Sequence, residues 1–158
     1  MNFDAALAQV LLFEGDYSDH VEDAGGKTRY GVTEAVAREV GYRGDMREFP
    51  LTLASRIYRD RYWDAMRCED LPDSLRYVVF DSAVNCGVGQ TTRWLQQTVG
   101  VTADGIIGPK TLSAVEDLGA DAIRSHMVAR RLRLMTSLPS WATFGKGWAR
   151  RLCDLLEA

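Results

Sequence analysis

Two acidic residues near the N-terminus have the spacing and the surroundings of a pair that could do acid–base chemistry. Glu14 ends a segment that is apolar on one side, and Asp23 follows nine positions later in a polar, glycine-rich stretch. Cleavage of a sugar chain needs one carboxyl group that stays protonated in a partly apolar setting, and usually a second group that is ionised and better hydrated. A carboxylate at a helix end and another on a tight polar turn are one way to meet both needs.

Both acids also have simpler interpretations. Glu14 could be a surface residue at a helix end, although the helix dipole disfavours a negative charge there. A loop acid such as Asp23 is usually just solvated, and the neighbouring acids compete with it for any catalytic role. These competitors are Asp16, Asp19 and Glu22.

Three further residues could contact a sugar. Gly26, in a Gly-Gly pair, would let the backbone approach a ligand closely, but any tight turn could use it. The Tyr30 ring could stack on a sugar or fill the core. Asn85, near the end of an apolar segment, could bind an N-acetyl group or cap a helix.

Hydrophobic spacing predicts a mainly α-helical chain that places these residues at helix ends and in one long loop. Helical periodicity over residues 3–14 ends at Glu14, and residues 15–32 carry no helical stripe, which predicts a loop or a short irregular hairpin. Thr33 is a good N-cap for a helix that stops at Gly41. Further helices are predicted over residues 52–63, 74–86, 89–99, from 109, 120–138 and 148–156.

Length and composition narrow the functional classes. A chain of 158 residues without a low-complexity linker is most simply one domain. A net charge of −3 makes neither nucleic acid nor an anionic membrane an obvious partner. The three cysteines contain no C-x-x-C pair, which predicts reduced thiols, and the two histidines lack metal-ligand spacing. We therefore expect no metal and no other cofactor.

Motifs spread over almost the whole chain resemble one known family. The motif E-G-x-Y begins at Glu14, and D-x-G-G-x-T-x-Y-G-V-T covers residues 23–33. The pattern continues through Tyr62-Trp63-Asp64, residues 80–87, residues 104–111 and a terminal group that includes Phe144, Lys146, Trp148 and Arg151. In this order and at these spacings the sequence resembles glycoside hydrolase family 108. Its members are bacterial and phage N-acetylmuramidases, lysozyme-like enzymes that cleave peptidoglycan.

The resemblance implies a mainly α, lysozyme-like single domain over residues 1–158, with an irregular active-site loop or short hairpin. Its catalytic part would span about residues 1–87, and a peptidoglycan-binding-like helical part about residues 88–158. The implied activity is hydrolysis of the β-1,4 bond between N-acetylmuramic acid and N-acetylglucosamine, without a cofactor.

The resemblance also implies roles for individual residues. Glu14 would protonate the leaving oxygen. The Glu14–Asp23 spacing resembles that of phage lysozymes with a Glu-Asp-Thr constellation, in which the aspartate holds the attacking water and a threonine assists. Thr28 would be that threonine, one residue closer than in the pattern. Tyr30, Gly26 and Asn85 would contact the sugar.

One residue departs from the family, which usually carries a second glycine where this chain has Asp16. Asp16 would add a negative charge beside Glu14 and could change the sugar contacts. Further along, Arg130, Arg131 and Arg133 could touch an anionic wall polymer, but such a run is more often a solvated helix face.

Three alternative functions stay open on the sequence. A lytic transglycosylase would cut the same bond with one glutamate and no water. A cysteine peptidase would pair one cysteine with His126, and a non-catalytic wall-binding protein would leave Glu14 idle. A zinc amidase would need more metal ligands than the chain offers.

The expected partner is peptidoglycan, reached without stable membrane insertion. The N-terminus lacks a basic segment before a long apolar core, so we expect no signal peptide. No apolar run approaches the ~18 residues of a membrane span. We therefore expect synthesis in the cytoplasm and action in the periplasm or wall, after a holin or another export system gives access. Phage lysis and a role in secretion are the two settings that fit.

Overall fold

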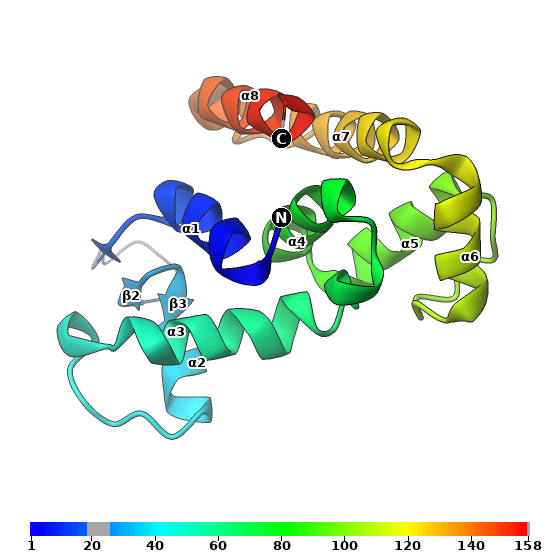
Figure 1. Ribbon diagram of the computed structural model, residues 1–158. Coiled ribbons are helices and arrows are strands. Elements are labelled where there is room, and N and C mark those ends of the chain that lie inside the picture. Colours follow the sequence, from blue (N-terminus) through cyan, green and yellow to red (C-terminus); the bar gives the residue numbers. More distant parts are fainter. Residues whose placement is uncertain (19–25, 158) are drawn as a thin grey trace. The chain divides into compact units, whose positions relative to one another are not determined.

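The computed structural model describes residues 1–18 and 26–157 and divides the chain into two compact units (Figure 1). Residues Phe3–Arg61 form one, here the N-terminal unit. Residues Met1–Asn2 and Tyr62–Ala158 form the other, here the C-terminal unit. Most described residues lie in helices, and the strands are confined to one small sheet, so the predicted mainly α fold is confirmed.

The N-terminal unit begins with the predicted helix, α1 (Phe3–Glu14), whose buried residues follow helical spacing. The stretch predicted as a loop or hairpin forms a small antiparallel sheet in the order β1-β2-β3. Its strands are β1 (Tyr17–Ser18), β2 (Thr28–Arg29) and β3 (Val32–Thr33). The pairing of β1 with β2 places residues 28–29 beside the chain that leaves α1.

The remainder of this unit follows the predicted helices closely. Thr33 is the N-cap of α2 (Glu34–Glu39), and its Oγ1 accepts a hydrogen bond of 3.3 Å from the Val36 N–H, as its residue type predicts. A 3₁₀ turn, η1 (Met46–Glu48), leads to α3 (Leu51–Tyr58), which continues as a π-helical turn, η2 (Arg59–Trp63). Ala54, Ile57 and Tyr58 form the buried face of α3.

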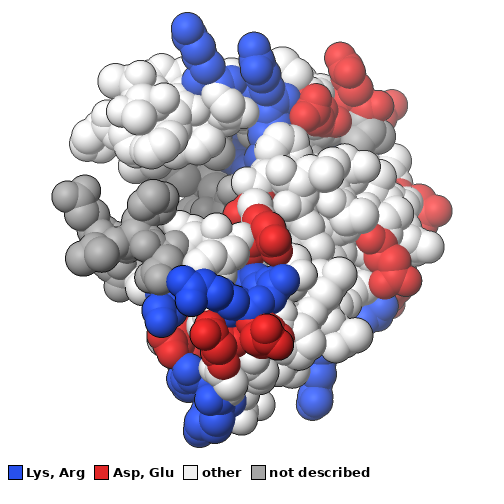
Figure 2. Space-filling view, turned by 90° about the vertical axis from the view of Figure 1, so that its left-hand side faces the viewer, with Lys and Arg blue, Asp and Glu red and all other residues white. Residues whose placement is uncertain are grey.

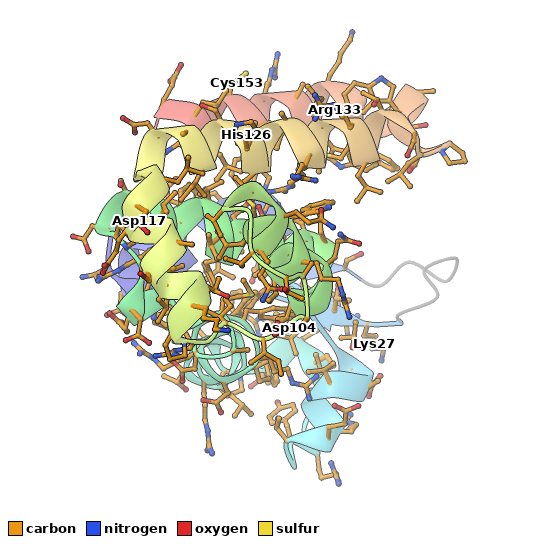
Figure 3. The ribbon with its side chains drawn as sticks, turned by 90° about the vertical axis from the view of Figure 1, so that its right-hand side faces the viewer. Lys27, Asp104, Asp117, His126, Arg133 and Cys153 are labelled. Atoms are coloured by element: carbon orange, nitrogen blue, oxygen red, sulfur yellow. The ribbon has the colours of Figure 1, made fainter. Side chains whose placement is uncertain are left out.

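The C-terminal unit is helical throughout its regular structure. A 3₁₀ turn, η3 (Cys68–Asp70), precedes its five helices, which are α4 (Asp73–Cys86), α5 (Val88–Thr98), α6 (Pro109–Leu118), α7 (Ala120–Thr136) and α8 (Trp141–Glu157). α7 and α8 lie side by side (Figures 1 and 3). The predicted start of the last helix at residue 148 was wrong, because α8 already begins at Trp141. Gly145 and Gly147 lower the helix propensity there, but the Trp141 ring lies directly over Gly145.

A buried charge cluster ties three helices of this unit together. The Asp81 carboxylate on α4 accepts hydrogen bonds from Arg131 on α7 and from Arg151 on α8, the latter at 2.6 Å through Nη2. Asp81 and Arg131 are fully buried. The sequence suggested that Arg131 lies on a polymer-binding face or on a solvated one. Both suggestions were wrong for this residue, because Arg131 is buried. Removing one member of such a cluster leaves an unpaired buried charge, which typically costs about 3–5 kcal/mol.

A second interior contact explains the motif at residues 104–111. The buried Gln96 amide donates to Asp104 Oδ1 at 2.6 Å and to the Ile106 carbonyl at 3.0 Å, and its oxygen accepts from the Gly105 N–H at 2.9 Å. The bond from Gln96, and after it one of 2.9 Å from the Ile106 N–H to Asp104 Oδ1, hold the pKa of Asp104 below its ordinary value. Asp104 lies in the turn before α6 (Figure 3). These hydrogen bonds indicate that the motif forms a structural turn.

The surface mixes charges of both signs. Figure 2 shows basic and acidic side chains next to one another, and exposed pairs such as Arg61–Glu39 and Arg38–Glu34 have N–O distances of 2.5 Å. In the described part of the chain, no helix combines the length and the apolarity that crossing a membrane would require.

Candidate active site

Glu14 is the last residue of α1, and its side chain is half-buried. Gly15 follows with φ = +77°, a backbone conformation that suits glycine and turns the chain out of the helix. The acid predicted from the sequence therefore stands where a helix stops and a loop begins, as its position in the hydrophobic pattern indicated.

The backbone of Gly31 packs against the Glu14 side chain. Its φ is +72°, and a Cβ added to it would lie 3.2 Å from both Cβ and Cγ of Glu14. The same Cβ would lie only 2.4 Å from the hydroxyl oxygen of Tyr58, a separation that real Cβ atoms do not adopt. Only a glycine fits beside these two side chains, which explains why residue 31 is a glycine.

Two hydrogen bonds hold the turn that carries Gly31. The Tyr58 hydroxyl, on α3, donates to the Tyr30 carbonyl oxygen at 3.0 Å. The Tyr30 N–H donates to the carbonyl oxygen of Asp16 at 2.8 Å. Tyr30 itself has φ = +52°, which is uncommon for a residue other than glycine. Both of its peptide groups are therefore pinned, one to α3 and one to the loop that follows Glu14.

Thr28 and Gly26 belong to the same segment. Thr28, in β2, lies opposite Ser18 on one side and Thr33 on the other, and it is half-buried. Gly26 is exposed with φ = +66°, and a Cβ there would meet open space. Asp23 and Gly25 lie outside the described residues. The structure thus brings Glu14, Tyr30 and Gly31 together and leaves the Gly26 backbone accessible.

Asp16 and Arg29 form an ion pair beside the Tyr30 ring. The Arg29 Nε lies 3.4 Å from Asp16 Oδ1, and its guanidinium carbon lies 5.0 Å from the centre of the Tyr30 ring. The negative charge that replaces the usual glycine is therefore matched by a positive one. Tyr30 also lines an open hollow of ≈ 440 Å³ with apolar residues of α1 and Leu51.

Asn85 lies in the C-terminal unit, near the end of α4. Its side-chain amide donates to the Asp81 carbonyl oxygen at 2.8 Å, one helical turn earlier. This bond lies within α4 and leaves both roles of Asn85, a helix cap and a sugar contact, as predictions.

The thiols and the metal-binding residue types do not form a second site in the part of the chain that the structure describes. All three cysteines are free, and burial raises the pKa of Cys68 and of Cys86, whereas a nucleophilic cysteine needs a lowered pKa. His126 and Cys153 are exposed on α7 and α8 (Figure 3). Among residues 1–18 and 26–157, no group of three His, Cys, Asp or Glu is placed to hold a metal.

Aromatic side chains gather on the first half of α8, where the sequence predicted no helix. Trp148 lies 6.2 Å from Trp141 and 5.9 Å from Phe144 between ring centres, and Phe144 is 55% exposed. Lys146 lines a neighbouring hollow of ≈ 480 Å³ beside Trp141. Exposed aromatic groups of this kind mark binding surfaces more often than isolated apolar residues do.

Sequence reasoning missed the contacts that hold Glu14 and the turns. Tyr58, Arg29 and Gln96 were not among the residues that the sequence singled out. The glycine pattern alone pointed toward Gly31. Tyr58, Arg29 and Gln96 contact residues outside their own helix or strand, and patterns along the chain do not predict such contacts.

Comparisons with known proteins agree with this geometry. The family described as "Glycosyl hydrolase 108" matches residues 7–87, and the family described as "Predicted Peptidoglycan domain" matches residues 90–153. A solved structure of SagA from Brucella abortus shares 35% sequence identity over 98% of this chain and 91% of that one, with a TM-score of 0.86. Among curated proteins, none matches the chain. The match over half of the chain shows that it belongs to glycosyl hydrolase family 108 and is a glycoside hydrolase that acts on peptidoglycan.

Proposed function

We propose that the protein is an N-acetylmuramidase that hydrolyses the β-1,4 bond between N-acetylmuramic acid and N-acetylglucosamine, with Glu14 as general acid. The observation that carries this proposal is the placement of Glu14. It is a half-buried carboxyl residue at the end of α1, with its side chain against the pinned Gly31 turn. A general acid must be held within hydrogen-bond reach of the oxygen that it protonates, and a fixed wall limits the positions that Glu14 can adopt.

The reaction that we propose breaks one bond and forms one. Glu14 gives its proton to the glycosidic oxygen as the C1–O bond of N-acetylmuramic acid breaks, and a water oxygen forms the new bond to C1. Asp23 positions this water or takes its proton, or stabilises the oxocarbenium-like centre, and Thr28 assists. Inversion at C1 would require Glu14 and Asp23 carboxyl groups about 6.5–9.5 Å apart, and retention about 5 Å.

Peptidoglycan would contact both units. In the N-terminal unit, the Tyr30 ring and the open backbone at Gly26 suit contact with a sugar ring. In the C-terminal unit, Asn85 could bind an N-acetyl group. The exposed Phe144 ring and the half-buried Trp148 ring offer apolar faces for sugars, and Lys146 offers a cation for the carboxylates of wall peptides. The match of residues 90–153 to a peptidoglycan domain supports the contacts on α8.

We further propose that the enzyme reaches the wall through a holin or another export system, in phage lysis or in secretion. The charge balance and the helices of the described residues give no sign of a membrane-inserting element. Expression of this chain alone in a bacterial cytoplasm should then leave cells intact until the inner membrane is permeabilised.

The experiment that tests the reaction identifies its products. A hydrolase leaves free reducing ends on N-acetylmuramic acid, whereas a lytic transglycosylase leaves internal anhydro rings, because the sugar's own hydroxyl attacks C1. The two products differ by one water, so mass spectrometry of muropeptides released from purified peptidoglycan distinguishes them. We expect reducing ends. Mainly anhydro products would replace the hydrolase with the transglycosylase and remove the proposed role of Asp23.

A further inference from the structure

We propose that Tyr58 is a positioning residue for Glu14, acting through the Tyr30–Gly31 turn. The proposal rests on the proposed function of Glu14 as the general acid. Tyr58 is 3% exposed and comes from the buried face of α3, so its ring is fixed by packing. Its hydroxyl group is the part of the side chain that reaches the turn.

The Tyr58 hydroxyl lies unusually close to the backbone of Gly31, because Gly31 has no side chain. The Tyr58 hydroxyl and the Cβ and Cγ atoms of Glu14 all lie beside the Gly31 backbone, around the space that a Cβ at this position would occupy. A shift of this backbone would move the surface against which the Glu14 side chain rests. The position of the carboxyl group therefore depends on what holds residues 30 and 31 in place.

The hydrogen bond from Tyr58 holds them together with the pairing of β2 and β3 on either side of the turn and a second hydrogen bond at Tyr30. It fixes the carbonyl end of Tyr30, while the Tyr30 N–H is tied to the Asp16 carbonyl oxygen, two residues after Glu14. A continuous connection therefore runs from α3 through the Tyr30 peptide groups to the chain that leaves α1. Tyr30 keeps its uncommon φ of +52° within this connection. Losing the Tyr58 bond would release one end of it.

The chain offers a matched control in the same unit. The Tyr42 hydroxyl donates to the Asp45 carbonyl oxygen at 2.8 Å, and a Cβ at Gly44 would lie 2.5 Å from it. The three nearest neighbours of that Cβ all belong to Tyr42, and none belongs to Glu14. Tyr42→Phe removes the same type of bond from the same type of glycine turn, without the connection to the acid.

The test compares four proteins on solubilised, uncross-linked peptidoglycan strands. These are Tyr58→Phe, Tyr42→Phe, Glu14→Gln and the double variant Tyr58→Phe/Glu14→Gln. We expect Tyr58→Phe to lower kcat about tenfold with KM unchanged, because a small misplacement of a catalytic group affects the transition state more than ground-state binding. Tyr42→Phe should leave both constants at the level of the unmodified enzyme. Thermal unfolding should show both single tyrosine variants folded, with Tm lowered by about 2–4 °C each.

The double variant separates this inference from the proposed function. If Tyr58 acts through Glu14, removing its hydroxyl from Glu14→Gln should cause no further loss of kcat. Equal kcat for Tyr58→Phe and Tyr42→Phe, or a full additional tenfold loss in the double variant, would overturn the positioning role while Glu14 keeps its own. Normal activity of a folded Glu14→Gln protein would instead overturn the proposed function and the inference with it.

Discussion

The N-terminal unit contains two turns of the same construction. In each, a tyrosine hydroxyl packs on a glycine and donates to a backbone carbonyl, Tyr58 on Gly31 and Tyr42 on Gly44. The Gly44 turn is local, since the Tyr42 hydroxyl donates to a carbonyl three residues away and Arg38 donates to the Gly44 carbonyl from six residues away. The Gly31 turn joins α3 to the end of α1, because Tyr58 is 28 residues from the carbonyl that it holds.

The surroundings of the two tyrosines also differ. Tyr58 is 3% exposed, whereas Tyr42 is only half-buried, with its ring edge-on to Phe49 at 5.1 Å. A half-buried ring can shift to accommodate a change, and a fully packed one cannot. The comparison teaches that a tyrosine on a glycine is a general way to fix a loop. By our proposal, only the contact of Tyr58 with Gly31 affects catalysis, because only the Gly31 backbone lies against the proposed acid, Glu14.

The largest expected effect comes from removing the group that distinguishes the two turns. Glu14→Gln keeps the size of the side chain and removes its acid, so activity on peptidoglycan should fall at least ~10²-fold, a typical contribution of acid–base catalysis. A turbidity assay measures the loss, and circular dichroism checks the fold. Near-normal lysis by the folded variant would contradict the role of Glu14 as general acid. The Gly31 turn would then lie beside no catalytic group, and the two turns would not differ in function.

An intermediate effect is expected from adding one methyl group to each glycine. Gly31→Ala forces a Cβ into a positive-φ position, against the buried Tyr58 hydroxyl and the Glu14 side chain. The variant should lose roughly 1–3 kcal/mol of stability and most of its activity. Gly44→Ala should lose about 1 kcal/mol or less and keep its activity, because the Tyr42 ring can move.

Chemical denaturation and a turbidity assay on the same two variants measure these changes. An equal loss of activity in both would show that the two turns are equivalent and that the contact with Glu14 has no special consequence. Normal activity in Gly31→Ala would lead to the same conclusion.

The smallest effect is expected from Asp16, although it is the residue that departs from the family pattern. The Tyr30 N–H is held by the Asp16 carbonyl oxygen, which any residue supplies, whereas the exposed Asp16 side chain pairs with the half-buried Arg29. Asp16→Asn should therefore change kcat by less than about threefold and stability by less than about 1 kcal/mol. The difference should shrink further at high salt, which screens exposed charges.

Kinetics at low and at high salt provide the measurement, with Glu39→Gln as a control that breaks another exposed pair in the same unit. A loss of tenfold or more in Asp16→Asn alone would mean that the Asp16 side chain, and not only its backbone, takes part in holding the site.

Much of the fold and part of the site could be predicted along the chain. Helical periodicity located α1 to Glu14, the residue type of Thr33 predicted its capping bond, and the glycine pattern marked the irregular segment that follows α1. The start of α8 at Trp141 could not be predicted from local preferences, because packing of the Trp141 ring over Gly145 offsets two helix-weakening glycines.

The sequence by itself therefore determined which segments are helical and that Glu14 stands at a helix end. These features depend on interactions between residues close along the chain. Only the tertiary structure decided that Tyr58 holds the turn beside Glu14 and that Arg131 is buried against Asp81. Those partners lie 28 and 50 residues apart, and such pairs form only when packed helices bring them together. Hydrophobic periodicity shows which face of a helix is buried, but it does not show which polar group on another segment that face will meet.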